Sequence, residues 1–339
     1  MWVLDNRTPY AVQRNWYLDK NAAKSWIVAV KGTWDILPDR TLSLAKNQLE
    51  PLYCETYRGE PGKSSIVYEG DLSGPKIATD VLLNGHAYAP EGGLASRVSV
   101  RMTIGSLTKS LLVSGDRYWV REMVGGVMMT PPTLFEKLPI IYERSYGGFD
   151  TRGTDPADHR YEPLNPIGTG FATREQHVDR KAVPNVEDPK NVISSWKDRP
   201  PPAGFGAISG YWLPRRSYAG TYNARWQKER FPLWAEDFDE RFFQCAPVDQ
   251  QVPGFVRGGE KVELVNLTPA GYLSFVLPRV YPVFTTRFGS EQIEHRARIQ
   301  TVILEPDYPR VVLVWHTALP CQHRADYLDA TVIGEKRYA

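Results

Sequence analysis

The cysteine and histidine residues near the end of the chain are the first candidates for chemistry. Cys321 and His323 are separated by one residue, and His316 is nearby. Cysteine thiolates and histidine imidazoles are groups that bind soft metal ions. A structural zinc site needs four ligands, commonly from paired Cys-x-x-Cys units, and the sequence has no such pair. We therefore expect neither a metal site nor a cofactor.

Carboxylates gather at two further places. Asp155, Asp158 and His159 have the residue types for proton transfer, but no nucleophile stands beside them, so the aspartates are expected to cap loop turns. Residues 236–240 resemble a calcium loop superficially, yet an arginine and a phenylalanine follow where an EF-hand needs a ligand and a glycine. A solvated surface is the better interpretation of this run.

Glycine-rich residues 204–210 are the remaining motif. They follow a proline run rather than a strand, so the sequence does not predict a dinucleotide-binding loop there. The chain also lacks a Gly-x-Ser-x-Gly elbow, a phosphate loop and a His-Glu-x-x-His pair. We predict no catalytic residues, although residues dispersed along the chain could still form an active site.

The elements around these residues are mainly strands. Residues 97–104 alternate strictly, with Val98, Val100, Met102 and Ile104 on one face. Turn residues at 84–85, 105–106, 115–116, 268–271 and 306–309 separate strand-like runs. The predicted strands cover residues 25–36, 65–72, 81–83, 86–88, 97–104, 107–113, 117–120, 135–146, 261–267, 272–277, 281–288, 298–305 and 310–316. Residues 1–24 are mixed and polar, and the tail from residue 324 is undistinguished.

An aromatic-rich stretch, residues 204–255, interrupts this β pattern. Tyr218, Tyr222 and Trp226 recur every four residues, which predicts one helix with Ser217 or Thr221 as its cap and with Tyr222 and Trp226 buried. Short helices should be confined mainly to residues 217–243. We predict two antiparallel β-sandwich or barrel-like units, residues 1–150 and 204–339, joined through loop-rich residues 151–203 and the aromatic connector.

Bulk properties restrict the class of protein. The chain has 339 residues and a formal net charge of +2, so no basic excess favours nucleic-acid binding. Three widely spaced cysteines fit a reducing compartment. No apolar run approaches the roughly 18 residues that span a membrane, and no signal peptide is visible. We expect a cytoplasmic protein that is not inserted in a membrane.

Several segments together resemble a bacterial family encoded beside type VI secretion spike genes. The segments are ATDVLLNGHAYAP (78–90), YERSYGGFD (142–150), NPIGTGF (165–171), PNVEDP (184–189), PAGFGAISGYWLPR (202–215) and ERFFQCAPVDQQ (240–251). The resemblance spans roughly residues 10 to 320. It implies a non-catalytic adaptor, or chaperone, that loads a toxin effector onto the VgrG spike, often through a PAAR-like tip. The alternatives are a hydrolase-like enzyme with its site in the 150–202 loops, or a structural part of the secretion particle.

The partner-binding surface is predicted from residue chemistry, because protein contacts favour aromatic anchors inside a charged rim. Residues 218–241 supply both kinds of side chain. The predicted contact residues are Tyr218, Arg225, Lys228, Arg230, Glu236, Asp237 and Asp239.

Overall fold

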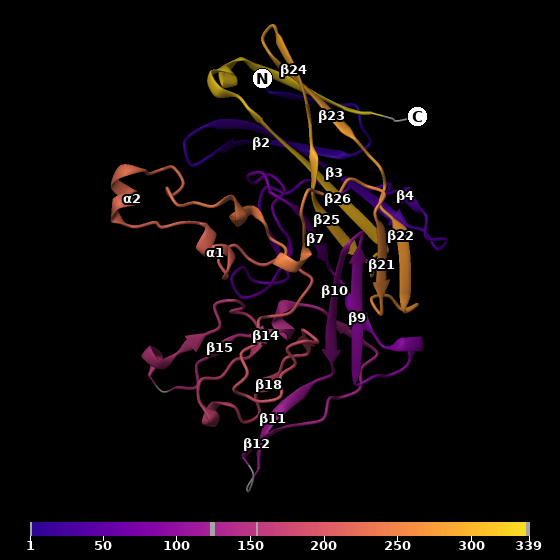
Figure 1. The fold of residues 1–339 in the computed structure, drawn as a ribbon, viewed down its shortest axis with the longest axis vertical. Coiled ribbons are helices and arrows are strands. Elements are labelled where there is room, and N and C mark those ends of the chain that lie inside the picture. Colours follow the sequence, from indigo (N-terminus) through magenta and orange to yellow (C-terminus); the bar gives the residue numbers. More distant parts are fainter. Residues whose placement is uncertain (1, 123–125, 154, 337–339) are drawn as a thin grey trace.

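The computed structural model describes residues 2–122, 126–153 and 155–336. Strands account for 42% of the chain and helices for 10%, which confirms a mainly β fold with short helices. Figure 1 shows the large sheets in the upper and right-hand parts of the molecule and a loop-rich lobe below them.

The largest sheet has the order β2-β3-β26-β25-β7-β20, with β4 beside β3. Its strands are β2 (Ala11–Leu18), β3 (Lys24–Ile36), β4 (Leu42–Leu44), β7 (Thr79–Leu83), β20 (Gln251–Val252), β25 (Arg298–Glu305) and β26 (Arg310–Pro320). β3 and β26 pair antiparallel from Asp35 opposite Arg310 to Ser25 opposite Pro320. Residues 311–315 are all buried, as their continuous apolar sequence predicts.

Two smaller sheets flank this one. A five-stranded sheet has the order β19-β10-β9-β21-β22, and a four-stranded sheet has the order β1-β27-β23-β24. The strands of the first are β9 (Arg97–Ile104), β10 (Leu107–Ser114), β19 (Val186–Glu187), β21 (Lys261–Val265) and β22 (Tyr272–Val276). Those of the second are β1 (Val3–Asn6), β23 (Pro282–Phe288), β24 (Glu291–Arg296) and β27 (Leu328–Glu335).

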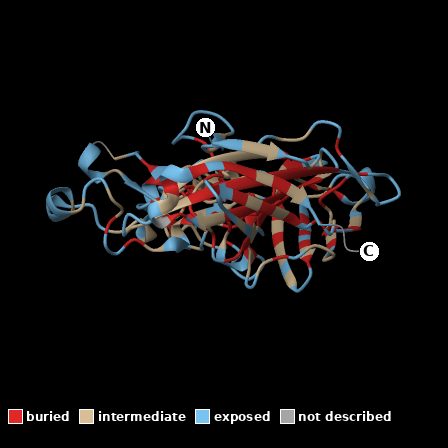
Figure 2. Ribbon diagram, turned by 90° about the horizontal axis from the view of Figure 1, so that it is seen from above, coloured by how far each residue is buried: buried red, intermediate tan, exposed pale blue. Residues whose placement is uncertain are grey.

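One hydrophobic core joins the three sheets. It contains Trp26 and Trp315 from the largest sheet, Val100 and Val262 from the five-stranded sheet, and Phe284 from the four-stranded sheet. Figure 2 shows the buried residues concentrated along the central strands. The sequence predicts successive β units at residues 1–150 and 204–339. In the structure, both the largest and the five-stranded sheets combine strands from these two ranges.

Three predicted hairpins are confirmed. β9 and β10 pair across Gly105 and Ser106, with Gly105 at a φ of +54°, and the alternating face of β9 is buried. β21 pairs with β22, and β25 pairs with β26, across the predicted turns. These turns combine glycine or proline with flanking strands that pair locally.

The hairpin predicted at Asn84-Gly85 is wrong. β7 already has β25 and β20 as its two neighbours, and β8 (His86–Tyr88) pairs instead with β13 (Lys137–Pro139). Asn84 and Gly85 therefore lead the chain from the largest sheet into the two-stranded β8–β13 sheet. The side chain of Asn84 donates to the Val67 carbonyl at 3.0 Å. The turn predicted at Gly115-Asp116 also connects two different sheets. The strand that follows it, β11 (Arg117–Glu122), pairs with β12 (Gly126–Met129) and β18 (Ala182–Val183) rather than with β10.

Two predicted strands are much shorter than expected. Of residues 65–72 only β6 (Ile66–Tyr68) is a strand, paired with β5 (Thr56–Tyr57). The strands in residues 135–146 are β13 and the start of β14 (Tyr146–Gly147), and Tyr142–Arg144 form a 3-10 helix. Leu72, Ile140 and Tyr142 are nevertheless buried, and Leu72 and Ile140 belong to the hydrophobic clusters of the sheets. Apolar residues outside the strands thus produced the strand-like pattern. The polar segments at both ends hold strands β2 and β27, which no sequence pattern indicated.

The lower lobe contains most of residues 117–200. Its short strand pairs are β14 with β17 (Thr169–Gly170) and β15 (Phe149–Asp150) with β16 (Arg160–Tyr161). A separate cluster that includes Trp119, Val178 and Ile193 forms its core. The 3-10 helices of the described residues are Pro90–Gly92, Tyr142–Arg144, Pro156–Asp158, Glu175–His177, Glu240–Phe243, Val248–Gln250 and Gln322–Tyr327. The described residues of the loops predicted at 150–202 are therefore ordered around a small core.

Candidate interaction surface

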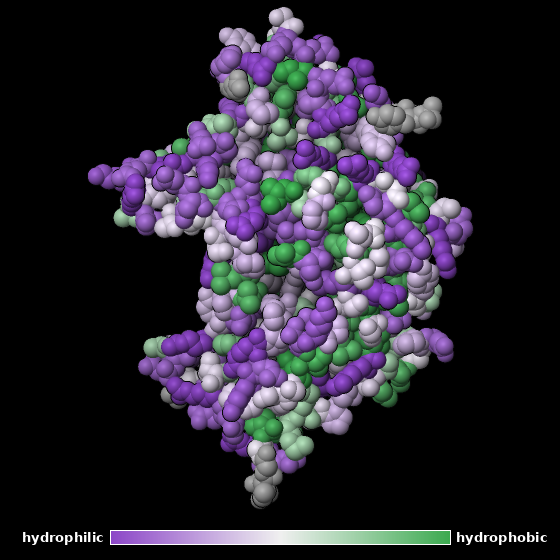
Figure 3. Space-filling model, in the orientation of Figure 1, coloured by the Kyte–Doolittle hydropathy of each residue, from purple (hydrophilic) through white to green (hydrophobic). Residues whose placement is uncertain are grey.

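Residues 216–234 form an arm that projects from the body of the molecule (Figure 1). It begins in helix α1 (Arg215–Tyr218) and contains helix α2 (Ala224–Glu229). Every residue of this range is described, and none of them is buried. Figure 3 shows the arm as a largely hydrophilic projection, with the outline of the molecule indented beneath it. The aromatic connector predicted to join two β units is thus, over residues 216–234, a surface feature.

The single helix predicted through Tyr218, Tyr222 and Trp226 is wrong. Gly220, at a φ of +88°, follows α1 and turns the chain away from helical geometry. Asn223 then caps α2, its side-chain oxygen accepting from the Trp226 backbone N–H at 3.0 Å. The glycine and the asparagine were the sequence signals for two helices, and the four-residue spacing of the aromatics concealed them.

The aromatic side chains of the arm pack mainly on one another. The Trp226 ring lies 4.8 Å from Tyr222 and 5.7 Å from Phe231, and its indole N–H donates to the Leu233 carbonyl at 2.9 Å. Tyr222 remains 45% exposed and Phe231 68% exposed. The prediction that Tyr222 and Trp226 are buried is wrong, because among the described residues no second element covers this cluster. Exposed aromatics in a rigid local cluster are typical anchors of protein contacts.

The base of the arm is attached to the turn between β2 and β3. The Arg230 guanidinium donates to the carbonyls of Lys20 and Trp234, and the Trp234 indole donates to the Leu18 carbonyl at 3.0 Å. The Trp234 ring also packs against the ring of the buried Phe238, with 4.5 Å between the ring centroids and a tilt of 32° between the rings. Arg230, predicted as a contact residue, therefore holds the arm in place.

The predicted acidic residues have mixed roles. Asp237 accepts from the backbone and hydroxyl of Thr221 at 2.8 Å, and these hydrogen bonds lower the pKa of Asp237. Asp239 accepts from the side chain and backbone of Arg241, which lowers its pKa, and the Arg241 guanidinium covers Tyr218 at 4.4 Å. Tyr218, Asp237 and Asp239, all predicted as contact residues, therefore stabilise the turns at the base of the arm.

The remaining predicted residues face solvent. Arg225 forms an ion pair with Glu229, one helical turn away, at 2.9 Å. Lys228 and Glu236 are exposed, and within the described part of the chain their side chains form no hydrogen bond or ion pair. A shallow pocket of about 570 Å³ lies between α2 and residues 236–237. Its walls include Trp226, Arg225, Glu229, Arg230, Glu236 and Asp237.

In the 150–202 loops, where an enzyme would have its site, Asp150 and His177 form a buried pair. His177 Nδ1 lies 2.9 Å from the Asp150 carboxylate, and both residues are buried. Burial by itself would raise the pKa of Asp150, but hydrogen bonds from Thr173 and His177 lower it below its ordinary value. Among the contacts of the described residues, no hydroxyl or thiol bonds to the other imidazole nitrogen. The pair is thus half of a catalytic arrangement, without a nucleophile in place.

A buried ionic cluster that sequence reasoning missed surrounds Asp80. Its carboxylate accepts from the Lys76 ammonium at 2.7 Å, from the Cys245 backbone N–H at 2.8 Å and from the Cys245 thiol at 3.2 Å. Burial raises the pKa of the Cys245 thiol well above its ordinary value, and the Asp80 charge raises it further. A protonated, buried thiol is a poor nucleophile, so we assign Cys245 no catalytic role. The hydrogen bonds of Cys245 to Asp80 instead attach the aromatic connector to β7.

The other candidate clusters of the sequence are also structural. His316 Nε2 lies 3.1 Å from the Ser73 carbonyl, while the Cys321 thiol donates to the Leu319 carbonyl at 3.4 Å. Asp155 caps a 3-10 turn, as predicted, through the Ala157 N–H at 2.8 Å. In residues 2–122, 126–153 and 155–336, no group of three or more Cys, His, Asp or Glu residues is placed to hold a metal ion. No helix in these ranges is long and apolar enough to cross a membrane.

Two of the distinctive sequence segments, 142–150 and 165–171, meet in the lower lobe. The Asn165 amide donates to the carbonyls of Tyr142 and Tyr146 at 2.8 and 3.0 Å. A side chain at Gly147 would place its Cβ 2.1 Å from the Asn165 carbonyl oxygen, so only glycine fits this close approach. These segments therefore build the fold.

Comparison with known protein families gives a match over most of the chain. The model of a bacterial family described as "Uncharacterized protein conserved in bacteria (DUF2169)" matches residues 21–316. No curated protein and no solved structure matches the chain.

Proposed function

We propose that this protein, which belongs to the uncharacterized bacterial family DUF2169, is a non-catalytic adaptor for type VI secretion. In this role it binds a toxin effector, through the effector's PAAR-like region or another part, and helps to load it onto the VgrG spike. The proposal rests on the sequence resemblance and on the shape of the molecule. The observation that carries it is the arm, residues 216–234, which is fixed at its base and buries none of its residues.

The arm has the chemistry of a transient protein contact. Its exposed charged residues, among them Arg225 and Lys228, and the neighbouring Glu236 lie around the aromatic cluster of Tyr222 and Trp226. An adaptor must release its partner and also remain stable alone, so a modest contact patch with a polar rim suits it. Large apolar contacts would instead favour a permanent complex.

The test is to remove the gene from the source bacterium and to measure the abundance and delivery of the effector. We expect both to fall while the secretion sheath still assembles. Unchanged effector abundance and delivery would contradict the proposal. Failure of sheath assembly would instead favour a structural part of the particle. A pull-down from the source cytoplasm, with mass spectrometry, would identify the effector.

A second candidate function is supported by the buried Asp150–His177 pair, whose geometry suits a general base. Hydrolysis of an ester or peptide panel that is abolished in a correctly folded His177→Gln variant would favour an enzyme. Equal background rates for the two proteins would favour the adaptor.

A further inference from the structure

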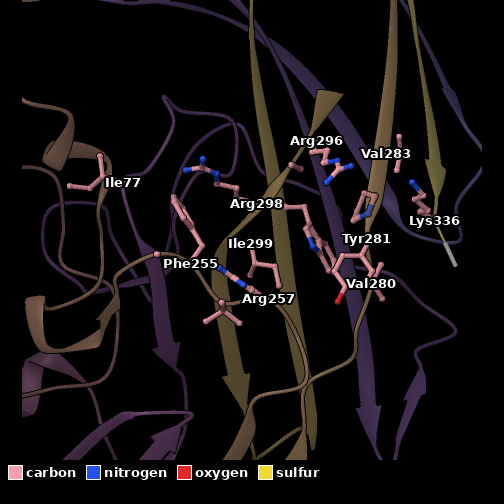
Figure 4. Close-up of a pocket in the computed structure, with 15 residues that line it drawn as sticks. Ile77, Phe255, Arg257, Val280, Tyr281, Val283, Arg296, Arg298, Ile299 and Lys336 are labelled. Atoms are coloured by element: carbon pink, nitrogen blue, oxygen red, sulfur yellow. The ribbon is translucent and has the colours of Figure 1, made fainter. Parts of the chain in front are cut away.

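A larger pocket, of about 860 Å³, opens where two sheets separate (Figure 4). β23 and β24 pair as far as Val283 and Arg296. Beyond that point the chain leaves the four-stranded sheet, and β25 joins the largest sheet, beginning with Arg298 opposite His316. The diverging strands form two walls of the pocket, and residues 254–257 form a third.

The floor of this pocket is apolar. Val256, Val280, Ile299 and Trp315 line it, and all four are buried in the body of the protein. Pro282, at the start of β23, adds a further apolar surface. The floor can therefore receive a large apolar side chain, because the surrounding strands already exclude water from beneath it.

Phe255 stands on the wall in an unusual backbone conformation. Its φ of +67° lies in the left-handed region, which bulky residues rarely adopt. The preceding residue, Gly254, has a φ of +76°, and the two residues together turn the chain at the pocket edge. The Arg298 guanidinium lies over the Phe255 ring at 4.8 Å. Such conformations persist where the surroundings fix them, and they concentrate at ligand-binding sites.

The rim of the pocket is positively charged. Arg257, Arg296, Arg298 and Lys336 line it and are exposed, and no Asp or Glu is among the described lining residues. The guanidinium groups of the three arginines form no ion pair with any carboxylate that the structure describes. The like charges of these three arginines repel one another, so an anionic ligand would relieve an unfavourable interaction as it bound.

We infer that this pocket binds an acidic peptide segment that carries one large apolar side chain. The apolar side chain would occupy the floor, and flanking carboxylates would pair with Arg257, Arg296 and Arg298. Arginine suits this role because its planar guanidinium binds a carboxylate through two parallel hydrogen bonds. Arg257 comes from residues 254–257, whereas Arg296 and Arg298 lie where the chain passes from β24 to β25. Because the arginines line a pocket with a broad apolar floor, one small inorganic anion would leave the floor uncovered. The inference uses no residue of the arm and does not depend on the proposed function.

The test uses the purified full-length protein and a fluorescent peptide with one phenylalanine between runs of Asp and Glu, measured by fluorescence anisotropy. We expect binding at low ionic strength that weakens as salt is added. The Arg296→Gln, Arg298→Gln double variant should bind at least about tenfold more weakly. The matched control is Arg101→Gln with Arg287→Gln, which removes two exposed arginines outside the pocket lining. This control should bind like the parent protein.

Two further probes separate the apolar and ionic contributions. A peptide with serine in place of the phenylalanine should bind more weakly, and inorganic phosphate should compete poorly. The thermal unfolding of both variants should stay within a few degrees of the parent, since the replaced side chains are exposed and the contact that the exposed Arg298 loses with the Phe255 ring is a weak one. The inference is overturned by a parent protein that does not bind the peptide, by equal binding of pocket and control variants, by equal binding of the serine peptide, or by efficient displacement with phosphate.

Discussion

Removal of the arm tests whether residues 216–234 are a surface feature or part of the core. Gly220 lies against Ala235, since a Cβ added at Gly220 would come within 2.8 Å of the Ala235 Cβ, so the two ends of the arm are close together. Replacing residues 222–234 with a Gly-Ser-Gly linker should therefore close the chain without moving the sheets.

The expected loss of stability is small. The replacement removes the hydrogen bonds from Arg230 to Lys20 and from Trp234 to Leu18, at about 1 kcal/mol each. It also removes the ring contact between Trp234 and Phe238, worth about 1 kcal/mol. The roughly fourfold shorter loop recovers about 1 kcal/mol of closure entropy. The net loss is about 2 kcal/mol, which corresponds to a fall in melting temperature of about 3 °C for a chain of this size.

Two measurements decide the matter. Thermal unfolding should show one transition within a few degrees of the parent, while capture of the effector identified by pull-down should be lost. A Trp212→Ala variant is the contrast, because that fully buried side chain should cost roughly 4 kcal/mol. An armless protein that unfolds as readily as Trp212→Ala would refute the surface interpretation. An armless protein that still captures the effector would place the contact elsewhere, as on the 150–202 loops.

The remaining predictions concern charge. Reversing Arg225 and Lys228 to Glu should weaken effector capture with an unchanged melting temperature, because both side chains face solvent; intact capture would contradict this. Replacing Asp80 with Ala should cost about 3–5 kcal/mol in denaturant unfolding, because it leaves the Lys76 ammonium buried without its partner; Lys76→Met with Asp80→Leu should cost much less. Burial and the charge of Lys76 lower the pKa of His316 to about 4. The unfolded chain thus binds the extra proton first, so stability should fall as pH drops from about 6.5 to about 4, and a His316→Gln variant should show a shallower fall.

Strand pairings that are local in sequence could be predicted. β9 and β10 are joined by Gly105 and Ser106, and both the alternation and the turn lie within one short segment. The pairs β21–β22 and β25–β26 follow the same rule. In each case the residues that fix the register are the residues that flank the turn, so the sequence contains the necessary information.

Pairings between distant strands could not be predicted. Val81 and Leu82 lie opposite Val302 and Ile303 in a parallel pair, and nothing near Val81 identifies that partner. The Asn84-Gly85 pair has the composition of a hairpin turn, but β7 was already enclosed on both edges. Turn propensity is a local preference, and a central strand with two distant neighbours overrides it.

The exposure of the arm and the location of the basic pocket could not be predicted from the sequence for a related reason. The spacing of Tyr222 and Trp226 gives the face that these residues share, but it does not say whether another element covers that face. In the basic pocket, Phe255, Tyr281 and Arg298 meet only because β23 and β25 diverge into different sheets. None of the three segments carries a recognisable motif. Long-range strand pairing had to be known before either surface could be located.

The arm and the basic pocket are physically separate parts of the molecule. Arg230 and Trp234 attach the arm to the β2–β3 turn, whereas the pocket lies between β23, β25 and residues 254–257. They share no lining residue among those that the structure describes. Free-energy changes at distant sites without shared partners usually add. A single ligand that spans both surfaces would break this additivity. If the arm variants lose effector capture but still bind the acidic peptide, the arm and the basic pocket are two independent contacts.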